Sequence, residues 1–358
     1  MNNRPTENAS IEEQERDSLA LSPLAESAVS LNESERAIDK YLSAALSGNT
    51  RRTYTSMLRS YVARGGRLPS SPDHLCHVLA TTAEALSPDS QTVLMSAISK
   101  WHSLAGFQDP TNDERVKLLL KGVRNTHGRA KRKAHPITPN ELNMMLVLAN
   151  QASCQRRALR DRALLLLSYF GNLRPNDVVT RSRRDVVIES RGMKLLIPES
   201  KTDQAHAGQC VYIPRNDDSE QWCPVAALDA WIALPPEVGS PPWRDEDPLF
   251  LQITRWGRLV WDEGRVQGIS EKAFNEFAQG YARKLGIRNV SGHSFRRGFT
   301  TAGIEAGSKF SHVKRQGRWV SDSSVSEYIE PATGYTRNAC VALYIAMVRS
   351  ENDGLPQG

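Results

Sequence analysis

Apolar residues in the first third of the chain recur at helical spacing, and polar or Gly/Pro-containing breaks separate the runs. Ile38, Tyr41, Leu42 and Leu46 form one such stripe, because residues three or four apart share one face of a helix. A new helix is predicted after each break. The predicted helices start at Leu31, Arg51, Pro72, Pro88 and Asp109. Residues 31–126 are therefore predicted to form a helical bundle.

The second half of the chain mixes helical and strand patterns. Thr138-Pro139-Asn140-Glu141 has the residues of a helix start, with a capping threonine, proline at N1 and glutamate at N3. An apolar helical stretch follows over 164–170. Three β-rich runs, at 186–188, 195–197 and 211–213, then predict a small antiparallel sheet, after which the pattern returns to helix. The chain is therefore predicted to be mainly α, with an α+β domain over 138–349.

A basic segment, residues 127–137, joins the two predicted domains. It contains Arg129, Lys131, Arg132 and Lys133 and no acidic residue. Such a linker is either a solvated loop or a strap that lies along the phosphates of a nucleic acid. A nucleic-acid site elsewhere in the chain favours the strap.

Charge is distributed unevenly along the 358 residues. Residues 1–36 hold eight acidic and three basic residues, a net charge of −5, whereas the whole chain carries +6, so the rest carries +11. A basic body of this kind favours a polyanionic partner such as a nucleic acid. Residues 1–30 are rich in Asn, Ser and Glu and poor in aromatic residues, so they are predicted to be a disordered acidic tail.

Composition argues against a membrane protein and against a disulfide-rich or zinc-binding one. The apolar runs are shorter than the ~18 residues that a membrane-spanning helix needs, and the first residues lack the apolar stretch of a secretory signal. The five cysteines are widely spaced and form no CxxC motif, so neither a disulfide framework nor a metal site is predicted. The chain is expected to be cytoplasmic, with no membrane partner.

Polar residues in the C-terminal third stand in an order that suits attack on a phosphodiester. His293 and Arg296 are three residues apart and so share a helix face. Gly317-Arg318-Trp319 follows, and Tyr328 comes nine residues after the tryptophan. A tyrosine hydroxyl can act as a covalent nucleophile. Arginine forks stabilise charge that develops on phosphoryl oxygens, and an indole N–H adds a further donor.

Two upstream positions complete this chemistry. Arg174 follows Gly171, which ends a predicted helix, and precedes Pro175, which suits the first position of the next helix. Its side chain is expected to project from the turn, with Asp177 placed to hold the guanidinium. Lys201 lies between two predicted strands, where a hairpin would carry it over a bound phosphate as the acid for a leaving 5′-hydroxyl.

Together these positions resemble the motif of the tyrosine recombinase (phage integrase) family. The family order of Arg, Lys, His-x-x-Arg, His or Trp, and Tyr maps here onto Arg174, Lys201, His293, Arg296, Trp319 and Tyr328. Tryptophan at 319, where histidine is commoner, points to the branch of the Cre recombinase. The resemblance covers residues 31–349. It implies a helical, SAM-like core-binding domain and a catalytic domain that cleaves and rejoins DNA through a 3′-phosphotyrosyl link, without cofactor, metal or ATP.

Each of these residues also has an ordinary structural interpretation. Taken alone, Arg174 suits a surface ion pair, Lys201 a solvated hairpin and Trp319 a packed core position. Two other tyrosines compete as nucleophiles. Tyr335 follows a glycine in a predicted turn, and Tyr344 is predicted to pack within an apolar helix. Only Tyr328 has the family's spacing from the tryptophan.

Two further segments are expected to contact partners. Thr50, Arg51, Arg52 and Tyr54 crowd a helix start, where they either bind a phosphate or form an ordinary cap. Residues 338–349 form a nearly all-apolar helix, which either packs on its own domain or, as the resemblance implies, docks on a neighbouring protomer of a cyclic tetramer. The resemblance further implies double-stranded DNA with inverted half-sites as the partner, a nucleoid location and room for accessory proteins.

Two other functions fit the same pattern. One is a non-catalytic DNA-binding regulator on the same fold, against which the full set of catalytic residue types argues. The other is a type IB topoisomerase-like or telomere-resolving enzyme. Strand exchange between two sites, as opposed to relaxation of supercoils alone, separates a recombinase from a topoisomerase.

Overall fold

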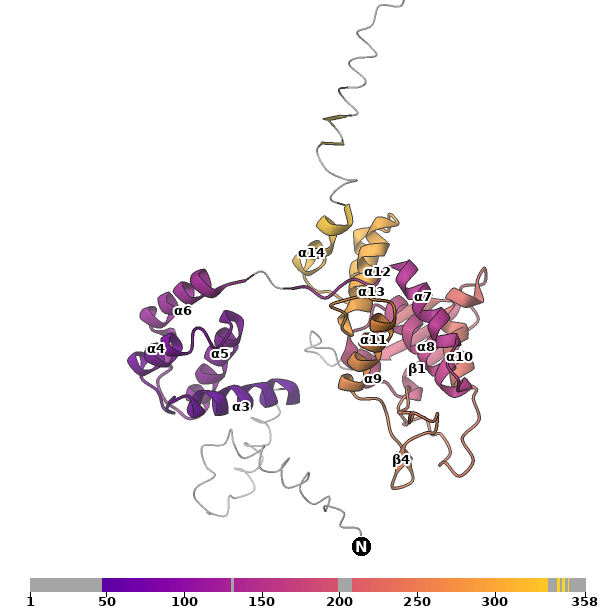
Figure 1. The fold of residues 1–358 in the computed structure, drawn as a ribbon, viewed down its shortest axis with the longest axis horizontal. Helices are drawn as coiled ribbons and strands as arrows, with labels where there is room; N and C mark the ends of the chain where they lie inside the picture. The colour runs from indigo at the N-terminus through magenta and orange to yellow at the C-terminus, as the bar shows by residue number, and fades with distance from the viewer. Residues whose placement is uncertain are drawn as a thin grey trace, which may run out of the picture. The chain divides into compact units, whose positions relative to one another are not determined.

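The computed structural model describes residues 47–129, 132–198 and 208–333, the last with side chains as far as Tyr328, together with Cys340, Val341, Leu343, Tyr344 and Met347. The chain divides into two compact units, residues 1–131 and 132–358 (Figure 1). The division falls inside the predicted basic linker. The predicted acidic tail, the helix expected from Leu31, and the residues Lys131, Lys201 and Tyr335 lie outside the described residues.

The described part of the first unit is all helical. Its helices are α3 (Gly48–Ala63), α4 (Pro72–Thr81), α5 (Pro88–Leu104) and α6 (Glu114–His127), with a 3-10 turn, η1 (Pro110–Asn112), before α6. Each α-helix begins after a serine or aspartate whose side chain accepts a backbone hydrogen bond. Their apolar faces meet in a core that includes Leu75, Leu79, Leu94 and Ile98.

Two of the predicted helix starts in this unit are wrong by a few residues. α3 begins at Gly48 and not at Arg51, because Ser47 is its N-cap and accepts from the Thr50 N–H. α6 begins at Glu114 and not at Asp109, because the intervening residues form η1 and Asp113 is the cap. Thr50 therefore lies within the first turn of α3, and not before it.

The second unit is built around α8 (Gln155–Phe170), which contacts α7, α10 and α12. The other helices are α7 (Pro139–Asn150), α9 (Pro175–Val179), α10 (Pro224–Ile232), α11 (Glu271–Lys284), α12 (His293–Glu305), α13 (Phe310–Gly317) and α14 (Asp322–Thr333), with 3-10 turns η2 (Arg183–Asp185) and η3 (Glu220–Trp222). The capping box predicted at Thr138 and Glu141 is confirmed at the start of α7.

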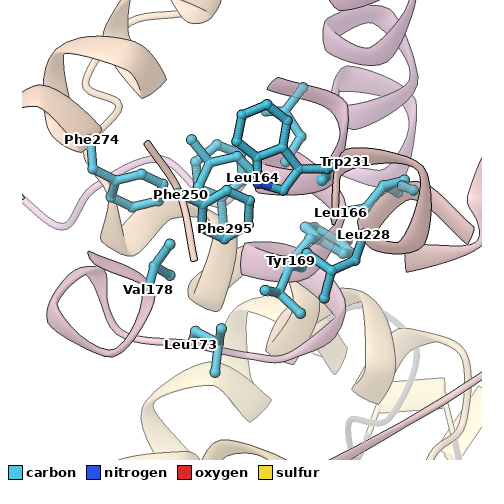
Figure 2. Close-up of a cluster of buried hydrophobic side chains, with 14 of the residues drawn as sticks. Leu164, Leu166, Tyr169, Leu173, Val178, Leu228, Trp231, Phe250, Phe274 and Phe295 are labelled. Carbon is cyan, nitrogen blue, oxygen red and sulfur yellow. The ribbon is translucent and has the colours of Figure 1, made fainter. Parts of the chain in front are cut away.

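Aromatic and leucine side chains fill the core between these helices. Figure 2 shows Leu164 of α8 beside Trp231 of α10, with Phe250 and Phe295 close by. All four are at most 1% exposed. The indole N–H of Trp231 donates to the Leu249 carbonyl at 2.8 Å, so the one polar atom of this ring is satisfied inside the core.

The predicted small antiparallel sheet is confirmed. Its strands β1 (Val186–Glu189), β2 (Gly192–Ile197) and β3 (Gln209–Pro214) pair in the order β1-β2-β3. Leu195 of β2 lies opposite Val186 on one side and Val211 on the other. A second, two-stranded sheet consists of β4 (Trp261–Asp262) and β5 (Arg265–Val266). The fold is thus mainly helical with small antiparallel sheets.

The end of the predicted linker packs on the second unit. The His135 N–H donates to the Asn289 carbonyl at 2.8 Å, and the Ile137 N–H donates to the Ser294 carbonyl at 3.1 Å. Ile137 is fully buried, and a side chain at Gly298 would collide with the Ile137 carbonyl. Residues 132–137 therefore approach α12 closely and belong to the second unit.

The residues described beyond α14 are helical, and their large side chains are exposed. Leu343 is 59% exposed and Tyr344 is 66% exposed. Tyr344 is therefore not packed on its own domain in this single chain, and its packing on a neighbouring protomer stays a prediction. None of the helices in the described ranges is both long and apolar enough to cross a membrane.

Candidate active site

Helix ends bring together several of the predicted polar residues that the structure describes in the second unit. Arg174 is the N-cap of α9, directly before Pro175 at the first helical position. This proline confirms the predicted turn, because its fixed φ suits a helix start and it has no N–H to satisfy. The Arg174 N–H donates to Asp177 Oδ2 at 3.1 Å, so the aspartate closes the first turn of this short helix.

Arg296, in the first turn of α12, is the most deeply fixed of the predicted catalytic residues. It is 4% exposed, and its guanidinium donates to the carbonyls of Asn172 and Gly317. Asn172 has a left-handed backbone, with φ 49°, in the turn between α8 and α9. One side chain therefore links the Arg174 turn, α12 and the end of α13.

The Gly317-Arg318-Trp319 segment ends α13 and lies against Arg296. The Arg296 Cζ stands 4.0 Å from the centroid of the Trp319 ring, a cation–π arrangement. Any side chain at Gly317 would collide with that ring, so glycine is required there. Trp319 thus lies beside Arg296, as the predicted site requires.

The structure gives Asp177 a different partner from the one expected. Its Oδ2 accepts from the guanidinium of Arg318 and from the backbone N–H of Arg174, whereas the sequence suggested a contact with the Arg174 guanidinium. The Arg318 and Asp177 side chains are 3% and 6% exposed. Among the described residues, the Arg174 Nη1 is buried and has no hydrogen-bond partner.

Tyr328 lies on α14, next to Trp319. The two ring centroids are 5.9 Å apart, and both rings pack on a small cluster formed by Ile304, Val313 and Val325. The Arg297 Cζ lies 5.0 Å from the centre of the Tyr328 ring. The phenol is therefore presented next to Arg297 by a helix whose Val325 packs with Ile304 and Val313.

The site carries an excess of positive charge. Burial, followed by the charges of Arg174 and Arg318, lowers the pKa of Arg296 to about 9, although Asp177 and Tyr328 oppose the shift. Burial is also the main cause that lowers the pKa of Arg318. Arg318 Nε and Nη1, like Arg174 Nη1, are buried without a partner in the described part of the chain. Three guanidinium groups thus face one carboxylate, an arrangement that favours an added anion.

His293 is the first residue of α12 and is exposed. Partial desolvation and the charges of Arg296 and Arg174 lower the pKa of its imidazole, while Glu271 and Asp177 act in the opposite direction. The lowered pKa favours the neutral ring, which can accept as well as donate a hydrogen bond.

The predicted DNA-contacting residues lie at the surface where they are described. Arg52, Arg129 and Arg132 are exposed, whereas Arg51 and Tyr54 are half-buried, Tyr54 against the core of the first unit. Thr50 shares a hydrogen bond of 2.8 Å with Ser47, so it takes part in the helix cap. Lys133 Nζ is 3.1 Å from Glu327 Oε2, next to Tyr328.

Three residues near the site were not predicted to act in it: Asn172, Arg297 and Arg318. The only sequence signal for Arg318 is a charged residue between a glycine and a tryptophan. Its left-handed backbone and its contact with Asp177, 141 positions earlier, cannot be read from local sequence. Among the described residues, no group of three or more His, Cys, Asp or Glu residues could hold a metal ion.

The chain belongs to the phage integrase family, whose model matches residues 135–334, more than half of its length. A similar protein is the integrase/recombinase xerD homolog of Selenomonas ruminantium. It is 27% identical over 282 residues, which cover 77% of this chain and 78% of that protein.

Several solved structures share the fold. The integrase of the Tn1549 transposon, in complex with a circular intermediate DNA, has a TM-score of 0.57 at 15% identity and covers 87% of this chain and 97% of its own. The XerH site-specific recombinase bound to a palindromic difH substrate has a TM-score of 0.56 at 15% identity and covers 84% of each chain. A lambda integrase dimer bound to a core site has a TM-score of 0.54 at 14% identity, and the match covers 85% of this chain and 95% of the lambda integrase chain.

Proposed function

We propose that this protein is a site-specific DNA recombinase of the tyrosine type. The observation that carries the proposal is that Tyr328 lies next to an arginine cluster formed by the half-buried Arg174 and the buried Arg296 and Arg318. The cluster has unpartnered guanidinium N–H groups and an excess of positive charge, which suits a phosphate in the transition state of displacement. Tyr328 supplies the nucleophile, and its ring lies against Trp319.

The proposed reaction conserves the energy of the phosphodiester bond. The Tyr328 hydroxyl passes its proton to a base, a transfer in which His293 assists, and attacks the phosphorus. A 3′-phosphotyrosyl bond forms and the bond to the 5′-oxygen breaks. Lys201 protonates that leaving oxygen. The 5′-hydroxyl of a partner strand then attacks the phosphotyrosine and frees Tyr328. Because one ester replaces another at each step, the cycle requires no ATP.

The remaining residues act on charge and orientation. Arg174 and Arg296 hold the non-bridging oxygens, Trp319 donates its indole N–H to the phosphate, and His293 assists proton transfer and orientation. Asp177 supports Arg174 by accepting a hydrogen bond from the Arg174 backbone N–H. The arginines supply the positive charge that a metal ion supplies in other phosphoryl-transfer sites. Trp319 in place of the commoner histidine supports an assignment to the Cre-like branch.

Double-stranded DNA with inverted half-sites is the proposed partner. The solved relatives named above were bound to DNA, and this chain carries a net charge of +6 despite its acidic first residues. The exposed Arg52, Arg129 and Arg132 are proposed as phosphate contacts, with Lys131 between the last two. The protein would then act in the cytoplasm at the nucleoid, with accessory proteins where the DNA site requires them.

We further propose that residues 338–349 join protomers into a tetramer on DNA. A groove of about 680 Å³ on the second unit is lined in part by apolar side chains, among them Phe170, Trp222, Phe299 and Val313, and in part by polar ones such as Asp217 and Arg315. The exposed Leu343 and Tyr344 of one protomer match the apolar lining of this groove on the next. Helix exchange of this kind is a heterologous contact that closes into a ring.

The central test is a covalent adduct between the protein and a nicked suicide substrate. Wild-type protein should form a DNA adduct in excess EDTA, and peptide mapping should locate it at Tyr328. Tyr328→Phe should bind the same DNA and form no adduct, while Tyr344→Phe serves as the matched control and should react normally. An adduct in Tyr328→Phe, or an absolute requirement for Mg²⁺, would reject the mechanism.

The assembly proposal has its own test. Deletion of residues 338–358 should leave binding to a single half-site intact and abolish pairing of two full sites and strand exchange. Gel shifts on one and two half-sites, with light scattering of the complexes, measure the two steps separately. Normal pairing by the truncated protein would show that this segment does not join protomers. Relaxation of supercoils without strand exchange by the full chain would identify a topoisomerase instead.

A further inference from the structure

Arg318 is buried beside Arg296 in the candidate active site, where Arg174 is half-buried, and the proposed chemistry gives Arg318 no task. Its backbone is left-handed, with φ 53° and ψ 43°, at the C-cap of α13. Glycine and asparagine tolerate this conformation, whereas the Cβ of other residues crowds the following carbonyl oxygen. The side chain is also charged and 3% exposed. An arginine at this position needs contacts that offset both the strain and the desolvation.

One carboxylate oxygen joins Arg318 to Arg174. Asp177 Oδ2 accepts from the Arg318 guanidinium and, at 3.1 Å, from the Arg174 backbone N–H. α9 has five residues, so this oxygen is a large part of what fixes its first turn. The position of the Arg174 backbone therefore depends on the ion pair.

Arg318 also determines which arginine Asp177 neutralises. Asp177 is three residues from Arg174, within side-chain reach on a helix turn. Because the carboxylate is engaged by Arg318, the Arg174 guanidinium keeps an unpartnered Nη1 within the described residues and remains available to a phosphate. Without Arg318, Asp177 would be free to pair with the Arg174 guanidinium.

The residues on either side of Arg318 contact Arg296, so the position of Arg318 also influences Arg296. The Gly317 carbonyl accepts from Arg296, and the Trp319 ring lies 4.0 Å from the Arg296 Cζ. A contact that fixes Arg318 against α9 thus also fixes the turn that carries these two neighbours.

We propose that Arg318 is a positioning residue. It engages Asp177 and holds the 317–319 turn against α9, so that the Arg174 guanidinium stays free and aimed at the phosphate. The inference rests on the proposed function, since it assigns Arg318 to the same phosphate site.

A double-mutant cycle tests whether Arg318 acts through Arg174. Arg318→Gly suits the left-handed turn and removes the ion pair. It should slow single-turnover cleavage by about tenfold or more through misplacement of Arg174, with half-site affinity changed less than about threefold. In an Arg174→Ala background, the same substitution should cost less than about twofold, because coupled residues are not additive.

A purely structural role of Arg318 would give a different pattern of cleavage rates in the double-mutant cycle. If Arg318 only stabilised the fold, Arg318→Gly would cost the same factor in both backgrounds, and that result overturns the proposal. Cleavage at the wild-type rate by Arg318→Gly overturns it as well. Arg318→Lys keeps the charge, so it should cleave faster than Arg318→Gly. If Arg318→Gly does not fold, the double-mutant cycle is run with Arg318→Lys in its place. The exposed Arg283 of α11 provides the matched control, Arg283→Lys, which should behave as wild type.

Anion binding gives a second measurement that needs no cleavage. Millimolar sulfate should raise the melting temperature of the wild-type protein by occupying the arginine cluster. The rise should be lost in Arg174→Ala and in Arg318→Gly, and kept in Arg283→Lys. An equal rise in Arg318→Gly, or none in wild type, contradicts the proposal. Wild-type protein that shows the sulfate effect but forms no DNA adduct would refute the recombinase proposal alone.

Discussion

The two sides of the candidate active site differ in how far they are built into the fold. On the arginine side, Asp177, Arg296 and Arg318 are at most 7% exposed. Arg296 donates to the carbonyls of Asn172 and Gly317, and Arg318 donates to Asp177. On the tyrosine side, His293 is exposed and Tyr328 is half-buried. Of the seven side chains described on α14, Val325 alone is buried.

The difference follows from what each side has to do. Groups that stabilise charge on a phosphate act most strongly when they are fixed in a low-dielectric surrounding before the substrate arrives. A nucleophile that becomes bonded to DNA must instead be reached from solvent by a large substrate. The arginine side therefore depends on the core for its geometry, and the tyrosine side depends on a few surface contacts.

The largest combined loss of cleavage rate and thermal stability is expected from Arg296→Met. It removes a transition-state donor and leaves the Asn172 and Gly317 carbonyls without their partner. Cleavage should fall by ~10³-fold or more, and the melting temperature should drop by roughly 5 °C, because buried carbonyls lose their hydrogen bonds.

Tyr328→Phe provides the contrast in the same assays. It should abolish the adduct and shift the melting temperature by less than about 1 °C, because it removes one oxygen at a half-buried position. Single-turnover cleavage and thermal unfolding measure both variants. An equal loss of stability in Arg296→Met and Tyr328→Phe would show that the tyrosine side is built into the fold as firmly as the arginine side.

A smaller effect is predicted for Lys201→Ala. Loss of a general acid should slow cleavage by ~10²-fold. Sulfur in place of the 5′-bridging oxygen is a better leaving group and should restore much of the rate. The same substrate should not rescue Arg296→Met, whose defect concerns the non-bridging oxygens. Failure of sulfur to rescue Lys201→Ala would mean that this lysine is not the acid.

The anchor of α14 can be tested with Val325→Ala. Truncation of this buried side chain should cost about 2 kcal/mol locally and slow adduct formation a few-fold. Amide exchange should speed up in α14 and remain unchanged in α8. Val320, which is 69% exposed, provides the control, since Val320→Ala should change neither quantity. Faster exchange across the whole unit would show that α14 is as firmly integrated as the arginine side.

The smallest predicted effect concerns pH. The folded protein lowers the pKa of His293, so below about pH 6.5 the unfolded chain binds more protons at this residue. The stability that His293 contributes is complete above that pH and is lost as the pH falls toward its folded pKa. His293→Gln should therefore lose less stability than wild type between pH 7.5 and about 5.5, as measured by thermal unfolding. His77→Gln, at an exposed position of α4, should follow the wild-type curve.

Much of the candidate site could be predicted from the sequence. The order and spacing of Arg174, His293, Arg296, Trp319 and Tyr328 identified the family, and local signals such as Pro175 placed Arg174 at a helix start. The helix starts of α3 and α6 were misplaced by three to five residues, because several polar residues near each start can act as a cap.

What the sequence alone determined is the family, the mainly helical architecture with a small antiparallel sheet, and the residues of the candidate chemistry. These depend on periodicity, on caps and turns, and on spacing along one stretch of chain. Only the tertiary structure showed that Asp177 pairs with Arg318 and not with the Arg174 guanidinium, and that Arg296 spans from Asn172 to Gly317. Two of these pairs lie more than a hundred positions apart, and Arg296 and Gly317 lie 21 positions apart on different helices, so the choice of partner depends on how the helices pack.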